Sequence, residues 1–317
     1  MNKTLLGNTD INLVPLVFGG NVFGWTIDEK TSFEILDAFV DAGFNAIDTA
    51  DVYSAWAPGN QGGESETILG NWFKARPGMR EKVSLFTKVG SEMGSPDKKG
   101  LSKRWIMQAV EDSLRRLQTD YIDLYFSHWP DENTPYEETL SAYETLMQQG
   151  KIRAIGASNL NAKQLYESLK QARSHKLPTY QVLQPEYNLY DRDGFNRDLQ
   201  TLCLKENIGV VTYFSLASGF LSGKYRSHQD LGQSQRGQGI EKYLNAKGFR
   251  ILNALDDIAE AQNAQPAHVA LAWLIAQQSV TAPIVSATKR EHVEGFVKAM
   301  EIELSDQEIS VLTEAGL

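Results

Sequence analysis

The pattern of hydrophobic and polar positions repeats one two-part unit along the chain. A short apolar run with few charges is followed each time by a longer segment whose apolar residues recur at helical spacing. Short apolar runs bounded by turn residues are typical of strands that are buried on both faces. We predict eight such strands, at residues 14–20, 44–50, 82–89, 121–128, 152–159, 180–188, 209–217 and 282–288.

The segments between these runs have the pattern of amphipathic helices. We predict helices at residues 31–43, 104–118, 135–151, 194–206, 266–278 and 290–300, and one that begins after Asn159 as its N-cap. Gly43 and Gly150 are expected to end two of them. The predicted buried faces are Phe33, Leu36, Phe39 and Val40 in the first helix, and Ile106, Val110, Leu114 and Leu117 in the second.

Eight alternations of strand and helix predict a parallel sheet, and eight units close naturally into a (β/α)8 barrel. A doubly wound open sheet is the competing fold. The first strand, however, is followed by GGNVFG, which lacks the GxGxxG fingerprint of dinucleotide-binding sheets. We therefore predict an α/β protein with one TIM-barrel domain over residues 1–317.

Two segments fall outside the repeat. Residues 4–14 have the pattern of a β-hairpin that turns at Gly7 and Asn8, and this hairpin would plug the lower end of the barrel. Residues 219–248, after the seventh strand, are rich in Gly, Gln and Ser. We interpret them as a long lid or binding loop.

Composition restricts the class of partner. The net charge of −9 disfavours nucleic acid, because phosphate binding requires clustered Lys and Arg. A single cysteine, Cys203, excludes an intramolecular disulfide, and its helical context predicts a buried structural thiol. The chain shows neither a signal-peptide pattern nor an apolar run of the ~20 residues that a membrane span needs. We expect a cytoplasmic protein that acts on small molecules and has no membrane partner.

Three consecutive predicted strands end on different ionisable residues. Asp48 ends the second strand, Lys88 the third and His128 the fourth, and Tyr53 lies just past the second. Each residue alone has an ordinary explanation, such as a helix cap, a solvated charge or a structural histidine. In a barrel, however, the C-terminal strand ends share one mouth, where active sites lie. The four residues together therefore predict a catalytic site.

The residue types indicate proton transfer to a carbonyl. A phenol has an ordinary pKa of about 10, and we expect the charge of Lys88 to lower the pKa of Tyr53. Asp48 would hold Lys88 in place, Tyr53 would be the general acid, and His128 would orient the carbonyl. The cluster has no nucleophile, so hydride would come from a cofactor. No metal is expected, because the five histidines show neither HxH nor HExxH spacing, and this disfavours a metal-dependent hydrolase.

With these residues the sequence resembles the aldo-keto reductase family over essentially the whole chain. The matching stretches are DTADVY, FTKVG, DLYFSHWP, GASN, QPEYN and YFSLASGFLSGKY. The resemblance implies a (β/α)8 barrel, a tetrad of Asp48, Tyr53, Lys88 and His128, and reversible reduction of aldehydes or ketones by NADPH, with NADH as the alternative. The family also includes nucleotide-binding potassium-channel subunits with slow turnover, which is the competing function.

The resemblance also assigns a cofactor site. It places Ser158, Asn159 and Gln184 at the nicotinamide carboxamide, and Tyr213 on the nicotinamide ring. Residues for the pyrophosphate and for the 2′-phosphate side are Leu216, Ser218, Gly219, Leu221, Lys224, Ser286, Thr288, Lys289, Arg290 and Glu294. The chain departs from the family at Glu291, where some members have Arg, and at Gly295, where many have Asn. Ser158 with Asn159 could instead cap a helix, and Tyr213 could pack in the core.

Aromatic residues in the loops after the first, second and fourth strands predict the substrate pocket. Aromatic side chains at a barrel mouth form an apolar pocket for a small carbonyl compound. The candidates are Phe23, Trp25, Trp56 and Trp129.

Overall fold

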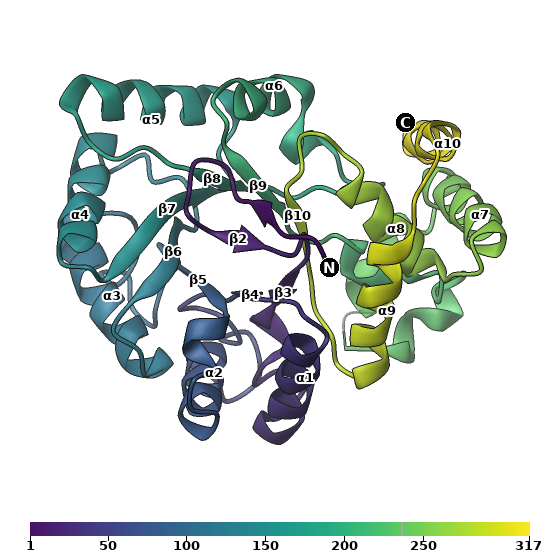
Figure 1. Ribbon diagram of the computed structural model, residues 1–317, viewed down its shortest axis with the longest axis horizontal. Helices are drawn as coiled ribbons and strands as arrows, with labels where there is room; N and C mark the ends of the chain where they lie inside the picture. Colours follow the sequence, from purple (N-terminus) through teal and green to yellow (C-terminus); the bar gives the residue numbers. More distant parts are fainter. Residues whose placement is uncertain (236) are drawn as a thin grey trace.

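A computed structural model describes residues 1–235 and 237–317. Eight parallel strands form a closed barrel in the order β10-β3-β4-β5-β6-β7-β8-β9, and helices surround it (Figure 1). The predicted TIM barrel is therefore confirmed, and each strand lies within its predicted range. The barrel strands are β3 (Val17–Gly19), β4 (Ala46–Asp48), β5 (Ser84–Val89), β6 (Ile122–Ser127), β7 (Ile152–Ser158), β8 (Val182–Gln184), β9 (Gly209–Thr212) and β10 (Ala282–Val285).

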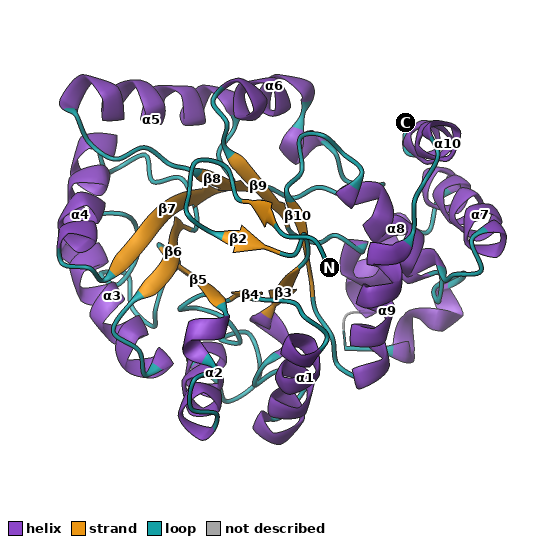
Figure 2. Cartoon of the chain, viewed as in Figure 1, coloured by secondary structure: helices purple, strands orange, loops and turns teal. Residues whose placement is uncertain are grey.

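The helices form the outer layer around the strands (Figure 2). Helices α7 and α10 lie farther from the barrel than their neighbours α8 and α9. The α-helices are α1 (Glu29–Asp41), α2 (Glu64–Ala75), α3 (Lys103–Leu117), α4 (Tyr136–Gln148), α5 (Ala162–His175), α6 (Arg197–Lys205), α7 (Ala246–Ala261), α8 (Pro266–Ile275), α9 (Arg290–Glu301) and α10 (Asp306–Ala315). Short 3-10 helices are η1 (Gly20–Val22), η2 (Arg80–Lys82), η3 (Asp193–Phe195), η4 (Ala217–Ser222), η5 (His228–Gln233) and η6 (Gly237–Tyr243).

The N-terminal hairpin of β1 (Thr4–Leu5) and β2 (Asn12–Leu13) closes the lower end of the barrel, as predicted. Its side chains Leu6, Ile11 and Leu13 belong to the same apolar cluster as the barrel interior. Gly7 turns there with φ +56°, and a Cβ at this position would lie 2.3 Å from the backbone nitrogen of Gly209. The hairpin therefore packs tightly against the start of β9.

The local sequence pattern predicted most helices, but it missed three helices and part of the buried face of α1. The buried face of α1 includes Ile35 as well as Leu36 and Phe39, whereas Phe33 and Val40 lie half-buried at its edges. The predicted stripe of α3 is buried throughout. Helices α2, α7 and α10 were not predicted. Residues 219–248 are not one open loop, because their described part includes η5 and η6 and leads into α7.

The N-cap of α5 was also predicted at the wrong residue. Asn161 rather than Asn159 caps this helix, and its side chain accepts from the backbone N–H of Gln164 in a capping box. Asn159 instead takes a left-handed conformation with φ +62° and turns its amide toward the barrel mouth. Cys203 is buried on α6, as expected. In the described part of the chain, we find no helix with the length and apolarity required to cross a membrane.

Candidate active site

The polar site is the layer of the barrel interior at the C-terminal ends of the strands. Side chains in a strand alternate between its two faces, so a residue two positions beyond an inward-facing one also points inward. Ala46, Phe86, Phe126, Val182 and Val211 all belong to the apolar interior cluster. Two positions after each of them comes a polar residue at the mouth, and these are Asp48, Lys88, His128, Gln184 and Tyr213.

Lys88 is the centre of this layer. Its Nζ donates to Asp48 Oδ2 at 2.7 Å, to the carbonyl oxygen of Thr49 at 2.8 Å and to Tyr53 OH at 2.8 Å. These three oxygens give each N–H group of an ammonium ion its own acceptor. Burial lowers its pKa, and the charge and hydrogen bond of Asp48 oppose that effect.

Tyr53 receives a hydrogen bond from Lys88 at its hydroxyl oxygen, so its own proton is donated elsewhere. In the structure the phenol donates to Asp48 Oδ2 at 3.4 Å, which is long for an O–H donor. Burial, followed by the charge of Asp48, raises the pKa of Tyr53 well above its ordinary value. The expected lowered pKa is therefore wrong for this structure, because burial and the charge of Asp48 outweigh the effect of Lys88.

His128 lies beside Tyr53, with 6.0 Å between the ring centroids. Burial and the nearby charge of Lys88 hold the pKa of His128 well below its ordinary value, so its ring is neutral at physiological pH. Its Nδ1 lies 3.2 Å from Ser91 Oγ. The structure thus brings together Asp48, Tyr53, Lys88 and His128, which the sequence predicted as one cluster.

The predicted carboxamide residues form a network on the opposite side of the mouth. Gln184 does not stand free, because its Nε2 donates to Asp48 Oδ1 at 2.9 Å. Asn159 donates to the backbone oxygen of His128 at 3.0 Å and accepts from Tyr213 OH at 2.7 Å. Ser158 Oγ donates to the backbone oxygen of Gln184 at 2.7 Å. These contacts tie strands β4, β7, β8 and β9 into one polar rim.

The predicted pyrophosphate loop turns sharply after β9. Ser218 and Gly219 both have positive φ, at +57° and +103°, inside η4. The Nζ of Lys224 would lie 4.0 Å from a Cβ at Gly219, so this cation lies above the turn. Leu216 begins the turn, whereas Leu221 is fully buried in the core. The loop therefore has a tight backbone turn with a positive charge over it.

The predicted 2′-phosphate residues surround the start of α9, but not all of them are free. Ser286 Oγ lies 2.7 Å from the backbone oxygen of Gly19, so this hydroxyl is engaged with the first barrel strand. The backbone N–H of Thr288 donates to His292 Nδ1 at 3.2 Å. Lys289 is the N-cap residue, and Arg290 lies 3.9 Å from Glu294 in an exposed pair. Lys289 and Arg290 place positive charge at a helix N-terminus.

Three of the four predicted pocket aromatics lie at the rim. Trp56 and Trp129 are about half exposed, at 48% and 49%. Trp25 meets Trp56 edge to face at 5.5 Å, and Trp56 in turn lies 5.9 Å from Tyr53. The prediction for Phe23 is wrong: this ring is fully buried and stacks on Phe18 in the layer between barrel and helices. Phe23 therefore supports the core rather than the mouth.

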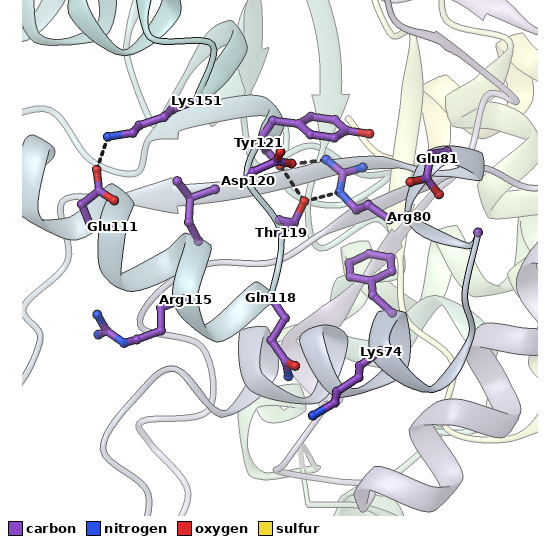
Figure 3. A pocket seen from close by; sticks show the side chains of 13 residues that line it. Lys74, Arg80, Glu81, Glu111, Arg115, Gln118, Thr119, Asp120, Tyr121 and Lys151 are labelled. Carbon is purple, nitrogen blue, oxygen red and sulfur yellow. Dashed lines mark hydrogen bonds and ion pairs between the residues drawn. The ribbon is translucent and has the colours of Figure 1, made fainter.

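A cavity of about 990 Å³ lies at the other end of the barrel, where residues preceding β5, β6 and β7 meet the ends of α2 and α3 (Figure 3). The guanidinium of Arg80 there donates to Thr119, to the backbone oxygens of Val83 and Tyr121, and to Asp123. Its hydrogen bonds are thus satisfied within the fold. Because active sites of TIM barrels lie at the C-terminal strand ends, we assign this cavity a structural role.

Sequence reasoning missed two contributors to the site. The backbone oxygen of Thr49 is the third acceptor of Lys88, and backbone acceptors leave no residue-type signal. Ser91 touches both His128 and Trp129 through one hydroxyl. Its position three residues after Lys88, in the loop that follows β5, was the available signal.

Comparison with known proteins identifies the family of the chain. A model of the family described as "Aldo/keto reductase family" matches residues 15–316. The chain is 34% identical to "Uncharacterized oxidoreductase YrpG" of Bacillus subtilis (strain 168), over 99% of this chain and 95% of that protein. It is also 34% identical to "Aldo-keto reductase YhdN" of the same organism, over 90% of this chain and 83% of that protein. A "Probable voltage-gated potassium channel subunit beta" of Oryza sativa subsp. japonica is 32% identical, over 94% and 90%.

The fold is a (β/α)8 barrel, and the family match with its reductase relatives defines the class as oxidoreductase. The chain belongs to the aldo/keto reductase family and is an NAD(P)H-dependent oxidoreductase.

Proposed function

We propose that this protein reduces aldehyde or ketone carbonyls to alcohols with NADPH, and that Tyr53 is the general acid. The observation that carries the proposal is the bonding of Lys88, whose three N–H groups are all used, one of them on Tyr53 OH. We also propose that residues 1–317 act as one barrel domain and that the protein works in the cytoplasm.

The arrangement favours proton donation from Tyr53. Lys88 donates to the phenol oxygen, and the hydrogen bond from the phenol to Asp48 is long at 3.4 Å, so a carbonyl oxygen at the mouth would replace Asp48 as the acceptor of the phenol proton. When that proton leaves, the developing phenolate stays within 2.8 Å of an ammonium ion that is already in place. Such a preorganised charge stabilises the transition state without reorganisation. Asp48 holds Lys88 in this position and Gln184 holds Asp48.

His128 would complete the carbonyl site. As a neutral imidazole next to Tyr53, it can donate one hydrogen bond to the same carbonyl oxygen. Two donors that converge on one oxygen polarise the carbonyl and stabilise its developing negative charge. The half-exposed Trp56 and Trp129 would cover the apolar part of the substrate.

The donor set of the mouth suits a nicotinamide dinucleotide. Asn159 and Tyr213 present a joined amide and phenol beside the tetrad. The positive-φ turn at Ser218 and Gly219, with Lys224 above it, suits a pyrophosphate, since close backbone approach and positive charge favour anions. The bound cofactor would supply the hydride. Lys289, at the start of α9, supports the preference for NADPH through its charge.

A substrate panel tests the proposal. Purified protein would be mixed with short aldehydes, dicarbonyls, sugar-derived aldehydes and aromatic aldehydes, each with NADPH and with NADH, and loss of reduced-cofactor absorbance would be followed. We expect steady-state turnover with NADPH that exceeds turnover with NADH. Absence of turnover with every carbonyl, despite measured binding of NADPH, would contradict the proposal and favour the competing role of a slow nucleotide-binding subunit.

A further inference from the structure

One serine joins the imidazole and the indole that follow β6. Ser91 lies in the loop after β5, whereas His128 and Trp129 are consecutive residues at the mouth. The Ser91 Oγ lies 3.2 Å from His128 Nδ1, and Trp129 Nε1 donates to the same Oγ at 3.2 Å. The proposed mechanism uses His128 but leaves open which of its two ring nitrogens has the proton.

The indole fixes the direction of one of these two hydrogen bonds and narrows the choice for the other. An indole nitrogen only donates, so Ser91 Oγ must accept from Trp129. One lone pair of Oγ is then used, and the Ser91 hydroxyl still has a proton to donate. Among the residues that the structure describes, the remaining partner of Ser91 Oγ is His128 Nδ1. An Nδ1 that accepts is unprotonated, so in a neutral ring the proton resides on Nε2.

We propose that Ser91 is a positioning residue that holds His128 as the Nε2–H tautomer, so that the imidazole presents a donor to the carbonyl oxygen. This inference rests on the proposed carbonyl reduction. It concerns a residue outside the tetrad, which acts only through His128.

The surroundings of His128 hold its backbone and the plane of its ring, so the tautomer is what remains to be chosen. Its backbone N–H donates to the oxygen of Val89 at 2.8 Å, and its backbone oxygen accepts from Asn159 at 3.0 Å. Its ring stacks on Trp129 with a centroid distance of 5.5 Å and an interplanar angle of 16°. Stacking holds the plane of the ring but does not choose a tautomer. The hydroxyl of Ser91 makes that choice.

The choice matters for catalysis because the two tautomers act oppositely on a carbonyl oxygen. The Nε2–H form donates to that oxygen and stabilises its growing charge. The Nδ1–H form would present the lone pair of Nε2, which repels the oxygen. Loss of the serine proton would mix the two forms, and we expect kcat to fall about 10-fold, which is less than the loss from deleting an oxyanion donor.

Threonine and valine at position 91 make a matched pair, because they have nearly the same shape and differ in the hydroxyl. Ser91→Thr and Ser91→Val would be compared in protein labelled with 15N-histidine. The His128 signals are assigned by their loss in His128→Gln, and circular dichroism checks the fold. If the β-branch is not tolerated, Ser91→Ala is compared with the wild type instead.

We expect the wild type and Ser91→Thr to show an unprotonated Nδ1, whereas Ser91→Val shows a mixture of tautomers and about 10-fold lower kcat with an unchanged NADPH Kd. A protonated Nδ1 in the wild type, or a tautomer unaffected by Ser91→Val, would overturn the inference. The NMR result needs no turnover, so an inactive protein with the expected tautomers would count against the proposed function and not against the role of Ser91.

Discussion

Lys88 Nζ lies 2.7 Å from Asp48 Oδ2, and the exposed fractions of the two side chains are 0% and 2%. Removal of one partner of a buried ion pair strongly destabilises the folded protein, because the other charge stays buried and unpaired. We therefore expect loss of either partner to affect both the stability of the mouth and the proposed chemistry, and mutation can separate the two effects.

Replacement of Lys88 by Met tests this separation. Lys88→Met removes the donor to Tyr53 and leaves Asp48 unpaired, so we expect a fall in kcat of about 100-fold or more and a lower Tm. The double variant Asp48→Asn/Lys88→Met removes both charges and should recover Tm without recovering kcat. Steady-state kinetics and thermal unfolding measure the two effects. Preserved turnover in either variant would show that the ammonium does not assist the proton donor.

Tyr53→Phe removes the proposed general acid while keeping the ring. We expect kcat to fall by about 10² to 10⁴-fold, with an unchanged Kd for NADPH, because the hydroxyl contacts Lys88 and Asp48. Fluorescence titration with NADPH and steady-state kinetics give the two numbers. Tyr136→Phe, at a half-buried tyrosine at the start of α4, is the matched control and should leave kcat unchanged. A near-normal kcat for Tyr53→Phe would place the proton donor elsewhere.

The pKa directions predict the pH profile of reduction. The pKa of Tyr53 is raised, so the phenol keeps its proton as pH rises, and the pKa of His128 is lowered, so the imidazole stays neutral as pH falls. Carbonyl reduction should therefore be nearly constant between about pH 6 and pH 9. Alcohol oxidation, which needs the deprotonated phenol, should rise with pH over the same range. A reduction rate that drops across neutral pH would mean that cofactor binding reverses the shift on Tyr53.

Lys289 should discriminate between the two dinucleotides. Lys289→Met removes positive charge from the start of α9, where the extra phosphate of NADPH is proposed to bind. We expect the Kd for NADPH to rise about tenfold and the Kd for NADH to change little. Lys298→Met, in the last turn of the same helix, removes the same charge at the other end and is the control. Equal effects of Lys289→Met on both cofactors would remove the assignment of the phosphate site.

Gly70 tests the packing of α2, the helix after the loop that includes Tyr53. In an open helix Gly→Ala is stabilising by about 1 kcal/mol. Here a Cβ at Gly70 would lie 2.1 Å from the backbone oxygen of Arg116 on α3, so the helices would have to separate. We expect Gly70→Ala to destabilise the fold by about 1 to 3 kcal/mol, measured by denaturant unfolding. Gly232→Ala, where a Cβ meets nothing within 4 Å, should change stability by less than about 0.5 kcal/mol.

The sequence by itself determined the barrel and placed its main ionisable residues at the mouth. Both follow from short-range rules: apolar runs alternate with helical periods, and a polar residue two positions after an inward-facing one shares its side of the strand. Asp48, Lys88 and His128 could therefore be placed together before any contact was known. The N-cap at Asn161 was also within reach, since its capping box is local.

Only the tertiary structure decided what these residues do to one another. Gln184 donates to Asp48, which lies 136 positions away in the chain, and Ser91 contacts His128, which lies 37 positions away. Phe23 is fully buried by residues outside its own loop. The raised pKa of Tyr53 is a further case. Desolvation and charge are sums over every neighbour in space, and most of those neighbours are distant in sequence, so no local pattern predicts their balance.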